Sequence, residues 1–227
     1  MRKYVERLII KNKTKSFSFD SSVSLGNIIN LVVDRLVMRL RGRMKLRFIV
    51  SKNSPYLGRN VRISGKCAFG STITIGSFTR ISGLAIEGVS LGNKVNIGAF
   101  SSIIASTTYN FLGRGIQISD NVAIGEYAYL GGAGGLTIGA NTIVGQYFSC
   151  HPENHRYSDK TKLIRLQGVT REGIHIGSNC WIGSKVTFLD GSKVGDNCVI
   201  AAGAVVTKKF GDSLMIGGVP AKILKVL

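Results

Sequence analysis

The feature that most constrains this chain is a six-residue repeat of bulky apolar residues, called markers below. The markers are Leu57, Ile63, Phe69, Ile75 and Ile81; Leu91, Ile97 and Ile103; Ile118, Ile124 and Leu130; Ile138, Val144 and Cys150; Ile176, Ile182 and Phe188; Val194, Ile200 and Val206. A spacing of six matches neither an α-helix nor an alternating strand. It predicts a coil with three short flat faces, in which three steps complete a turn of about 18 residues.

The residues beside the markers fit the corners of such a coil. A glycine often follows the marker, as at Gly76 and Gly183, and a small or thin residue often stands two positions before it. With 29 Gly and only 3 Pro, the composition is typical of many tight corners rather than of a disordered chain. The sequence therefore predicts an all-β domain in which successive turns stack as parallel strands, about 4.8 Å apart.

The four cysteines follow the same register. Cys67, Cys180 and Cys198 fall at the small inward position, and Cys150 is itself a marker. We expect buried, reduced thiols, although Cys180 and Cys198 are one turn apart, which leaves a disulfide conceivable. The absence of a CxxC spacing means that no metal site is expected.

Two insertions interrupt the repeat. A short one runs from Ala105 to Arg114, and the largest covers residues 151–173. Because loops on rigid scaffolds tend to carry function, the histidines in and beside the larger one are candidate general bases. His151 and His155 lie within it, close to Glu153 and Asn154, which are candidates to orient an imidazole or to bind an acceptor.

Residues 1–56 differ from the repeat domain of residues 57–227. Residues 1–59 carry 14 Lys and Arg against three acidic residues, a net charge of +11 of the total +18. Residues 24–47 predict an amphipathic helix with Leu25, Ile28, Ile29, Val32, Leu36 and Leu40 on one face. This helix either caps the first coil or lies on an anionic membrane. No nucleic-acid motif accompanies the charge, and no signal-peptide-like apolar segment opens the chain, so a cytoplasmic protein is expected.

The stretches IGSNCWIGSKVTFLDGSKVGDNCVIAAGAVVTK and IGGVPAKIL resemble the hexapeptide-repeat acetyltransferases, such as the galactoside, maltose and xenobiotic acetyltransferases. The segments ENHRYSD and QGVTREGIHIG look most like the branch found in capsule, O-antigen and exopolysaccharide gene clusters. The resemblance spans residues 57–227 and implies a left-handed parallel β-helix assembled as a homotrimer. It further implies transfer of acetyl from acetyl-CoA to a hydroxyl of a sugar or lipid-linked saccharide, in surface polysaccharide synthesis. The alternative is N-acetylation of a nucleotide-linked amino sugar. The location implied is the cytoplasm, with peripheral contact at the inner face of the bacterial membrane.

The resemblance also assigns roles to residues. His155, eleven positions after Val144, matches the family's catalytic histidine as we align it, and His151, in an HP pair, is the second choice. His175 directly precedes a marker and should face outward. The residues expected to bind the coenzyme are Trp181, Ser184, Ala202, Thr207, Lys208, Lys222 and Lys225. The segment TKKFGDS lacks the usual proline pair after the TK motif. A zinc site would require three converging histidines, and a non-enzymatic solenoid would show no large insertion.

Overall fold

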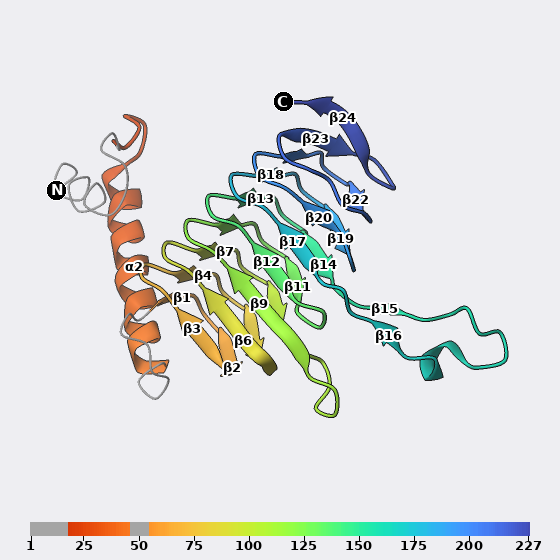
Figure 1. The fold of residues 1–227 in the computed structure, drawn as a ribbon. Helices are drawn as coiled ribbons and strands as arrows, with labels where there is room; N and C mark the ends of the chain where they lie inside the picture. The colour runs from red at the N-terminus through yellow and green to blue at the C-terminus, as the bar shows by residue number, and fades with distance from the viewer. Residues whose placement is uncertain (1–17, 46–54) are drawn as a thin grey trace.

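The computed structural model describes residues 18–45 and 55–227, in which a long solenoid of parallel strands carries a helix across its N-terminal end (Figure 1). The solenoid has three faces, each formed by one sheet, and only the last pair of the first sheet, β23 and β24, is antiparallel. The predicted parallel β-helix is therefore confirmed for the described residues.

Each turn from β1 to β20 contributes a short strand to all three sheets, and the last turns contribute to fewer. The first sheet contains β1 (Tyr56–Leu57), β4 (Thr74–Ile75), β7 (Asn96–Ile97), β10 (Ala123–Ile124), β13 (Ile143–Val144), β18 (Trp181–Ile182), β21 (Val199–Ile200), β23 (Leu214–Gly217) and β24 (Lys222–Val226). The second contains β2 (Arg62–Gly65), β5 (Arg80–Gly83), β8 (Ser102–Ile104), β11 (Tyr129–Gly131), β14 (Ser149–His151), β19 (Thr187–Leu189) and β22 (Val205–Val206). The third contains β3 (Cys67–Phe69), β6 (Ala85–Leu91), β9 (Gly113–Ile118), β12 (Leu136–Ile138), β17 (Ile174–Ile176) and β20 (Lys193–Val194).

The markers form the core of the solenoid. They pair in register from turn to turn, for example Ile75 with Ile97 and Ile182 with Ile200. All are buried except Ile63 and Phe69, which lie in β2 and β3, the edge strands of the second and third sheets. Leu57, in the edge strand of the first sheet, is buried, because the helix packs against β1. In the first turn, a marker is therefore buried where α2 covers its strand and partly exposed where the strand forms an open edge.

The solenoid continues beyond Val206, the last marker. Val199 pairs in parallel with Met215, and Phe210 and Ile216 are buried in the core. The six-residue pattern did not predict this final turn, because Phe210 follows Val206 after four residues instead of six. The segment 207–227 is therefore part of the solenoid up to β23, and only β24 reverses direction.

The predicted N-terminal helix is present as α2 (Leu25–Lys45). Its Gly42 lies against Pro55, where a β-carbon would collide with the carbonyl oxygen, and the Arg35 guanidinium donates to Thr74 Oγ1 at 3.0 Å. The six apolar residues predicted for one face share an arc of about 120°, but they differ in burial. Ile28 is buried and Val32 half-buried, whereas Leu25, Ile29, Leu36 and Leu40 are exposed. Among the described helices, none is long and apolar enough to cross a membrane.

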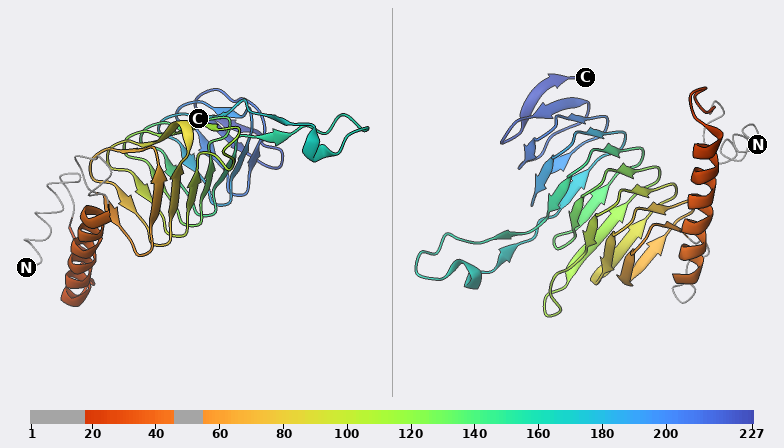
Figure 2. Two further views of the ribbon diagram at one scale, coloured as in Figure 1. Left: turned by 90° about the horizontal axis from the view of Figure 1, so that it is seen from below. Right: turned by 180° about the vertical axis from the view of Figure 1, so that it is seen from behind.

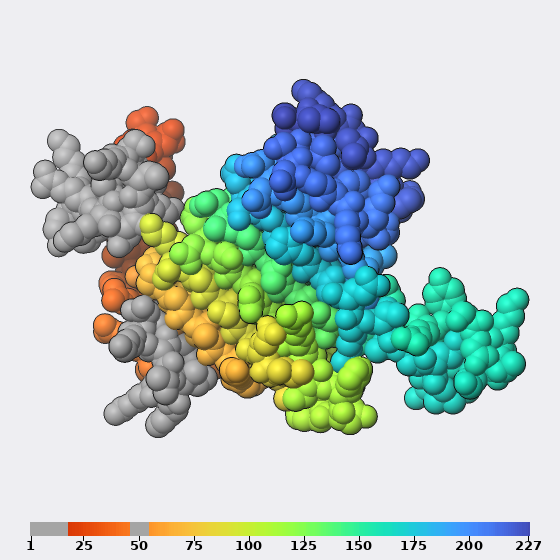
Figure 3. Space-filling view, viewed as in Figure 1, coloured from red at the N-terminus to blue at the C-terminus, as the bar shows by residue number. Residues whose placement is uncertain are grey.

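Both insertions leave the solenoid at the corner between the second and third sheets. Residues 105–112 join β8 to β9. Residues 151–173 form an arm, built on the antiparallel pair β15 (Asn154–His155) and β16 (Val169–Thr170) and carrying the short 3-10 helix η1 (Ile164–Leu166). The arm projects far from the solenoid in every view (Figures 2 and 3).

A ladder of aromatic rings runs along the corner between the first and second sheets. Phe78, Phe100, Tyr127 and Tyr147 occupy the same corner position in four successive turns, each with φ between 57° and 59°. Bulky residues rarely adopt this left-handed conformation. Their rings stack at centroid distances of 5.1, 5.1 and 5.0 Å and remain about half exposed.

Candidate functional site

His151 lies at the root of the arm, where the chain leaves the wall of the solenoid. It is the last residue of β14, beside Leu189 of β19 in the next turn. Its ring stacks on that of Tyr129 in the preceding turn, with centroids 5.2 Å apart and planes 19° from parallel. The side chain is exposed, but desolvation by the atoms around the ring lowers the pKa of the imidazole from its ordinary value, which favours the neutral ring. A neutral imidazole on a rigid strand is suited to accept a proton at neutral pH.

His155 occupies a different environment from His151. It lies in β15, on the arm itself, opposite Val169 of β16, and its side chain is exposed. The four residues that separate the histidines in sequence therefore carry His155 off the solenoid wall and onto the arm. Both side chains are exposed, but only His151 lies on a strand of the solenoid wall with its ring stacked on another. The role predicted for His155 stays a prediction.

The arm is fastened to the shorter insertion by Arg171. Its guanidinium bonds the Glu153 carboxylate at 2.6 Å and donates to the carbonyl oxygens of Phe111 and Leu112, both at 3.3 Å. It also lies over the Phe111 ring, 3.9 Å from the centroid. Glu153 therefore pairs with an arginine rather than with either histidine near it. The exposed side chain of Asn154 makes no hydrogen bond within the described part of the chain.

A second anchor holds the returning strand of the arm. The carboxylate of Asp190, just after β19, accepts three hydrogen bonds. Two come from the backbone N–H groups of Glu172 and Gly173, at 2.9 and 2.8 Å, and one comes from the Thr170 hydroxyl, at 3.1 Å. The root of the arm is thus fixed on both sides, which holds His151 in a defined frame.

The only tryptophan lies on the outer face of the first sheet, where it was expected. Trp181 is 58% exposed. It pairs with Val199, which pairs with Met215, which in turn pairs with Lys225. Since neighbouring strands lie about 4.8 Å apart, Trp181 and Lys225 share one outward row with about 14 Å between them.

The remaining coenzyme candidates gather on the last turns. Ser184 lies on the corner after β18, where its hydroxyl donates to Gln146 Oε1 at 3.0 Å, and Ala202 occupies the same corner one turn later. Thr207 and Lys208 follow β22 and are exposed, with the Lys208 ammonium 5.5 Å from the Phe210 ring centroid. Lys222 and Lys225 are exposed on β24. The sequence candidates thus form one surface around the C-terminal turns.

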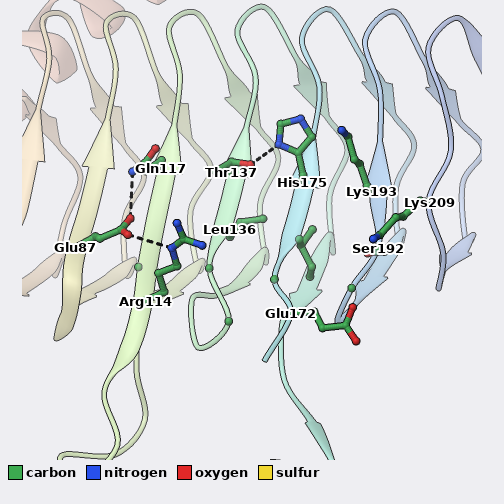
Figure 4. Close-up of a pocket in the computed structure, with 16 residues that line it drawn as sticks. Glu87, Arg114, Gln117, Leu136, Thr137, Glu172, His175, Ser192, Lys193 and Lys209 are labelled. Atoms are coloured by element: carbon green, nitrogen blue, oxygen red, sulfur yellow. Dashed lines mark hydrogen bonds and ion pairs between the residues drawn. The ribbon is translucent and has the colours of Figure 1, made fainter. Parts of the chain in front are cut away.

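A separate polar groove crosses the outer face of the third sheet (Figure 4). Its volume is about 290 Å³, and Glu87, Arg114, Gln117, Thr137, Glu172, His175, Lys193 and Lys209 contribute side chains to it. His175 faces outward as predicted, and its Nδ1 lies 2.7 Å from the Thr137 hydroxyl. Burial and the neighbouring Lys193 lower the pKa of its imidazole. This groove lies round the corner from His151.

The four cysteines are free thiols. Burial is confirmed for Cys150, Cys180 and Cys198 but not for Cys67, which is partly exposed in the edge strand β3. Burial raises the pKa of the Cys180 thiol to about 11 and that of Cys150 well above its usual value, so both are neutral near pH 7. Within residues 18–45 and 55–227, no group of three metal-ligating side chains is found.

Tyr129, Arg171 and Asp190 were missed by the sequence reasoning. Asp190 had a local signal, because it belongs to an Asp-Gly pair, a typical turn dipeptide, between the markers Phe188 and Val194. Nothing local distinguishes Tyr129 or Arg171, because their partners lie in other turns and loops.

Comparison with known proteins places the chain in a family. The model of the bacterial transferase hexapeptide (six repeats) matches residues 173–208. A protein of Escherichia coli K12 named as a lipopolysaccharide biosynthesis O-acetyl transferase, WbbJ, is 32% identical over 140 residues, which cover 58% of this chain and 71% of that protein. The galactoside O-acetyltransferase of the same organism is 32% identical over 94 residues, 40% of this chain and 43% of that enzyme.

Among solved structures, a maltose O-acetyltransferase from Clostridium difficile 630 aligns over 100% of this chain and 86% of its own, with 16% identity and a TM-score of 0.45. The family assignment depends on the sequence relatives and on the hexapeptide match, which agree with the observed solenoid. The chain therefore belongs to the hexapeptide-repeat acetyltransferases.

Proposed function

We propose that this protein transfers an acetyl group from acetyl-CoA to a hydroxyl of a sugar or lipid-linked saccharide, in the synthesis of a surface polysaccharide. The observation that carries the proposal is His151 at the anchored root of the arm, where its ring stacks on that of Tyr129 and desolvation lowers the pKa of its imidazole. The O-acetyl transferase named for lipopolysaccharide biosynthesis, to which the chain is similar, supports an oxygen acceptor. A location in the cytoplasm is part of the same proposal.

The base would act on the acceptor. A sugar hydroxyl has a pKa far above neutral, so its attack on a thioester needs a proton acceptor in place. In the proposed step, His151 takes the hydroxyl proton while the oxygen attacks the thioester carbonyl carbon. The imidazolium then returns that proton to the sulfur as the carbon–sulfur bond breaks. The products are the acetyl ester and free coenzyme A, and the imidazole is regenerated. His155, the first choice from sequence, is the competing base.

The outward row from Trp181 to Lys225 is suited to bind the acyl donor, acetyl-CoA. An exposed tryptophan at one end offers an apolar surface for a pantetheine arm, and Ser184, Ala202 and Thr207 lie beside it. Lys208, Lys222 and Lys225 supply exposed cations for the phosphates, where a compact ammonium serves as a point charge. We therefore assign acetyl-CoA to this surface.

We further propose a left-handed solenoid assembled as a homotrimer, as in the family that the sequence resembles. The aromatic ladder supports an assembly, because contiguous exposed aromatic side chains are typical of protein interfaces. In such an assembly the projecting arm of one subunit would reach a neighbour, which is the arrangement in which His155 would approach a donor.

Titration calorimetry with acetyl-CoA tests the proposal. The wild-type protein should bind it, and Lys222→Ala/Lys225→Ala should weaken binding by about 1–2 kcal/mol, roughly tenfold, through lost charge-assisted contacts. The matched control is Lys66→Ala/Lys94→Ala, which removes two exposed lysines from the first turns and should leave the affinity unchanged. A wild-type protein that binds no acetyl-CoA would overturn the proposed function.

A further inference from the structure

The N-terminal helix α2 exposes a continuous apolar stripe. Leu25, Ile29, Val33, Leu36 and Leu40 fall within an arc of about 80° round the helix, at 100° per residue. Val37 and Met44 widen the arc to about 120°. All seven side chains are exposed, Leu36 to 63%. An apolar helical face of this width is normally covered.

The stripe faces away from the solenoid. The solenoid side of α2 is defined by Gly42 against Pro55 and by Arg35 and Arg39, whose guanidinium carbons lie 5.7 and 5.9 Å from the Tyr56 ring centroid. Gly42, Arg35 and Arg39 lie about 160°, 140° and 100° round the helix from the centre of the seven-residue stripe. The helix is therefore already fixed on one side and unpartnered on the other within the part of the chain that the structure describes.

Positive charge surrounds the stripe. Arg41 lies about 40° beyond one edge of the stripe, Arg43 lies in line with Leu25 at the other edge, and Lys45 follows in the last turn. The whole segment 1–59 carries a net charge of +11. Apolar residues between cations are the arrangement by which interfacial helices bind anionic lipid, since the apolar face enters the head-group region and the cations meet the lipid charge.

The charge of the helix argues against pairing of the stripe with a second copy. From Leu25 to Met44 the steps are 4, 4, 3, 4 and 4 residues, so the stripe lacks the alternating steps of 3 and 4 of a left-handed heptad seam. The helix carries four arginines and a lysine against Asp34 alone, so two copies laid together would bring like charges against one another. A lipid surface imposes no register and attracts the same cations.

We propose that α2 docks the protein on an anionic lipid surface through the stripe formed by Leu25, Ile29, Val33, Leu36 and Leu40. The helix lies across the first turn, so the solenoid extends from it away from the bilayer (Figures 1 and 2). The proposal is independent of acetyl transfer, because it concerns a surface at the opposite end of the molecule from β24.

Vesicle flotation of the full chain tests the docking. We expect binding to vesicles of phosphatidylcholine mixed with phosphatidylglycerol, loss of most binding at high salt, and little binding to phosphatidylcholine alone. Leu36→Gln should reduce partitioning at least about tenfold, because a buried leucine is lost from the interface. The matched control is Ile86→Gln, which changes a residue 68% exposed on the solenoid and should bind as the wild type does.

Arg43→Gln tests the charge separately and should reduce binding to the anionic vesicles by about fivefold. Thermal unfolding and circular dichroism of each variant check that α2 and the solenoid are retained. Equal vesicle binding by the wild type, Leu36→Gln and Arg43→Gln would overturn the proposal. So would a change in molecular mass of Leu36→Gln in solution without vesicles, since the stripe would then be a contact between copies of the chain.

Discussion

At the scale of single residues, two histidines four positions apart have different chemistry because of what surrounds them. Both side chains are exposed, but the His151 ring stacks on Tyr129 at the solenoid wall, whereas His155 lies on the projecting arm. Counting from a marker favours His155, but a count along the chain carries no information on solvation. A base needs a fixed position, which favours His151 within one subunit, because its ring stacks on Tyr129 at the solenoid wall.

Substitution of the two histidines distinguishes them. His151→Ala should lower kcat by about 10²–10⁴-fold, the usual effect of removing a positioned base, with little change in acetyl-CoA affinity. His155→Ala should be mild by comparison. Steady-state kinetics and calorimetry on the same preparations measure both quantities. If His155→Ala abolishes turnover while His151→Ala does not, the base comes from the arm, as the sequence count predicts.

The pH profile provides a second measurement on the same residue. Protonated imidazole cannot accept a proton, so kcat/KM should fall as the pH drops through the pKa of His151. Desolvation lowers that pKa, so the acid limb should lie below the ordinary histidine value of about 6.5. A profile whose acid limb lies above this value would contradict the assignment.

At the scale of elements, the arm owes its direction to contacts with parts of the chain far away in sequence. Arg171 joins it to residues 111 and 112, and Asp190 ties the returning strand to the next turn. Glu153 and Arg171 are the least exposed ion pair among the described residues, so each partner depends on the other. The hairpin pairing of β15 with β16 is short and would not by itself fix the arm.

Arg171→Gln should loosen both insertions without unfolding the solenoid. It removes the partner of a partly buried carboxylate and contacts with two carbonyl groups, at a local cost of about 1–3 kcal/mol. Hydrogen exchange should increase in residues 105–112 and 151–173, and kcat/KM should fall while the Tm stays close to that of the wild type. Arg165→Gln, on the exposed 3-10 helix of the arm, is the control and should change neither. Unchanged exchange in both insertions would show that Arg171 does not hold them.

At the scale of the whole molecule, the solenoid presents aligned columns of side chains, and the aromatic ladder is one of them. Its members adopt left-handed backbone conformations that are unfavourable for bulky residues, yet they recur in four successive turns. Stacking with neighbours offsets part of that strain. A column of half-exposed rings along one edge is suited to meet the same column of other subunits round a symmetry axis.

Phe100→Asn/Tyr127→Asn tests this assembly. Asparagine tolerates the left-handed conformation, so the turns should be preserved while two rings are removed. Light scattering should report a trimer for the wild-type protein and a smaller species for the variant, with activity reduced if the site lies between subunits. Asn121→Ser, which changes a corner residue away from the ladder, is the control and should leave the mass unchanged. An active wild-type monomer would contradict the trimer.

The sequence by itself determined the solenoid. Its core is periodic, and each marker needs only the residues one turn before and after it, so local spacing is enough to identify nearly every buried position from Leu57 to Val206. It also located the insertions and the N-terminal helix. The prediction failed where the step changes, at Phe210 and Ile216, and where a turn lacks a neighbour, at Ile63 and Phe69.

Only the tertiary structure decided the features that depend on contacts between distant parts of the chain. Desolvation of His151 arises from Tyr129 and the neighbouring turns, and Glu153 is held by an arginine eighteen residues later. The outward row from Trp181 to Lys225 exists because β24 folds back on β23, which no repeat predicts. The exposed side of α2 was likewise fixed by its docking on β1. A repeat specifies which side chains point inward. Function depends on the contacts of the outward side chains, and those contacts are set by how the turns, the insertions and the helix pack together.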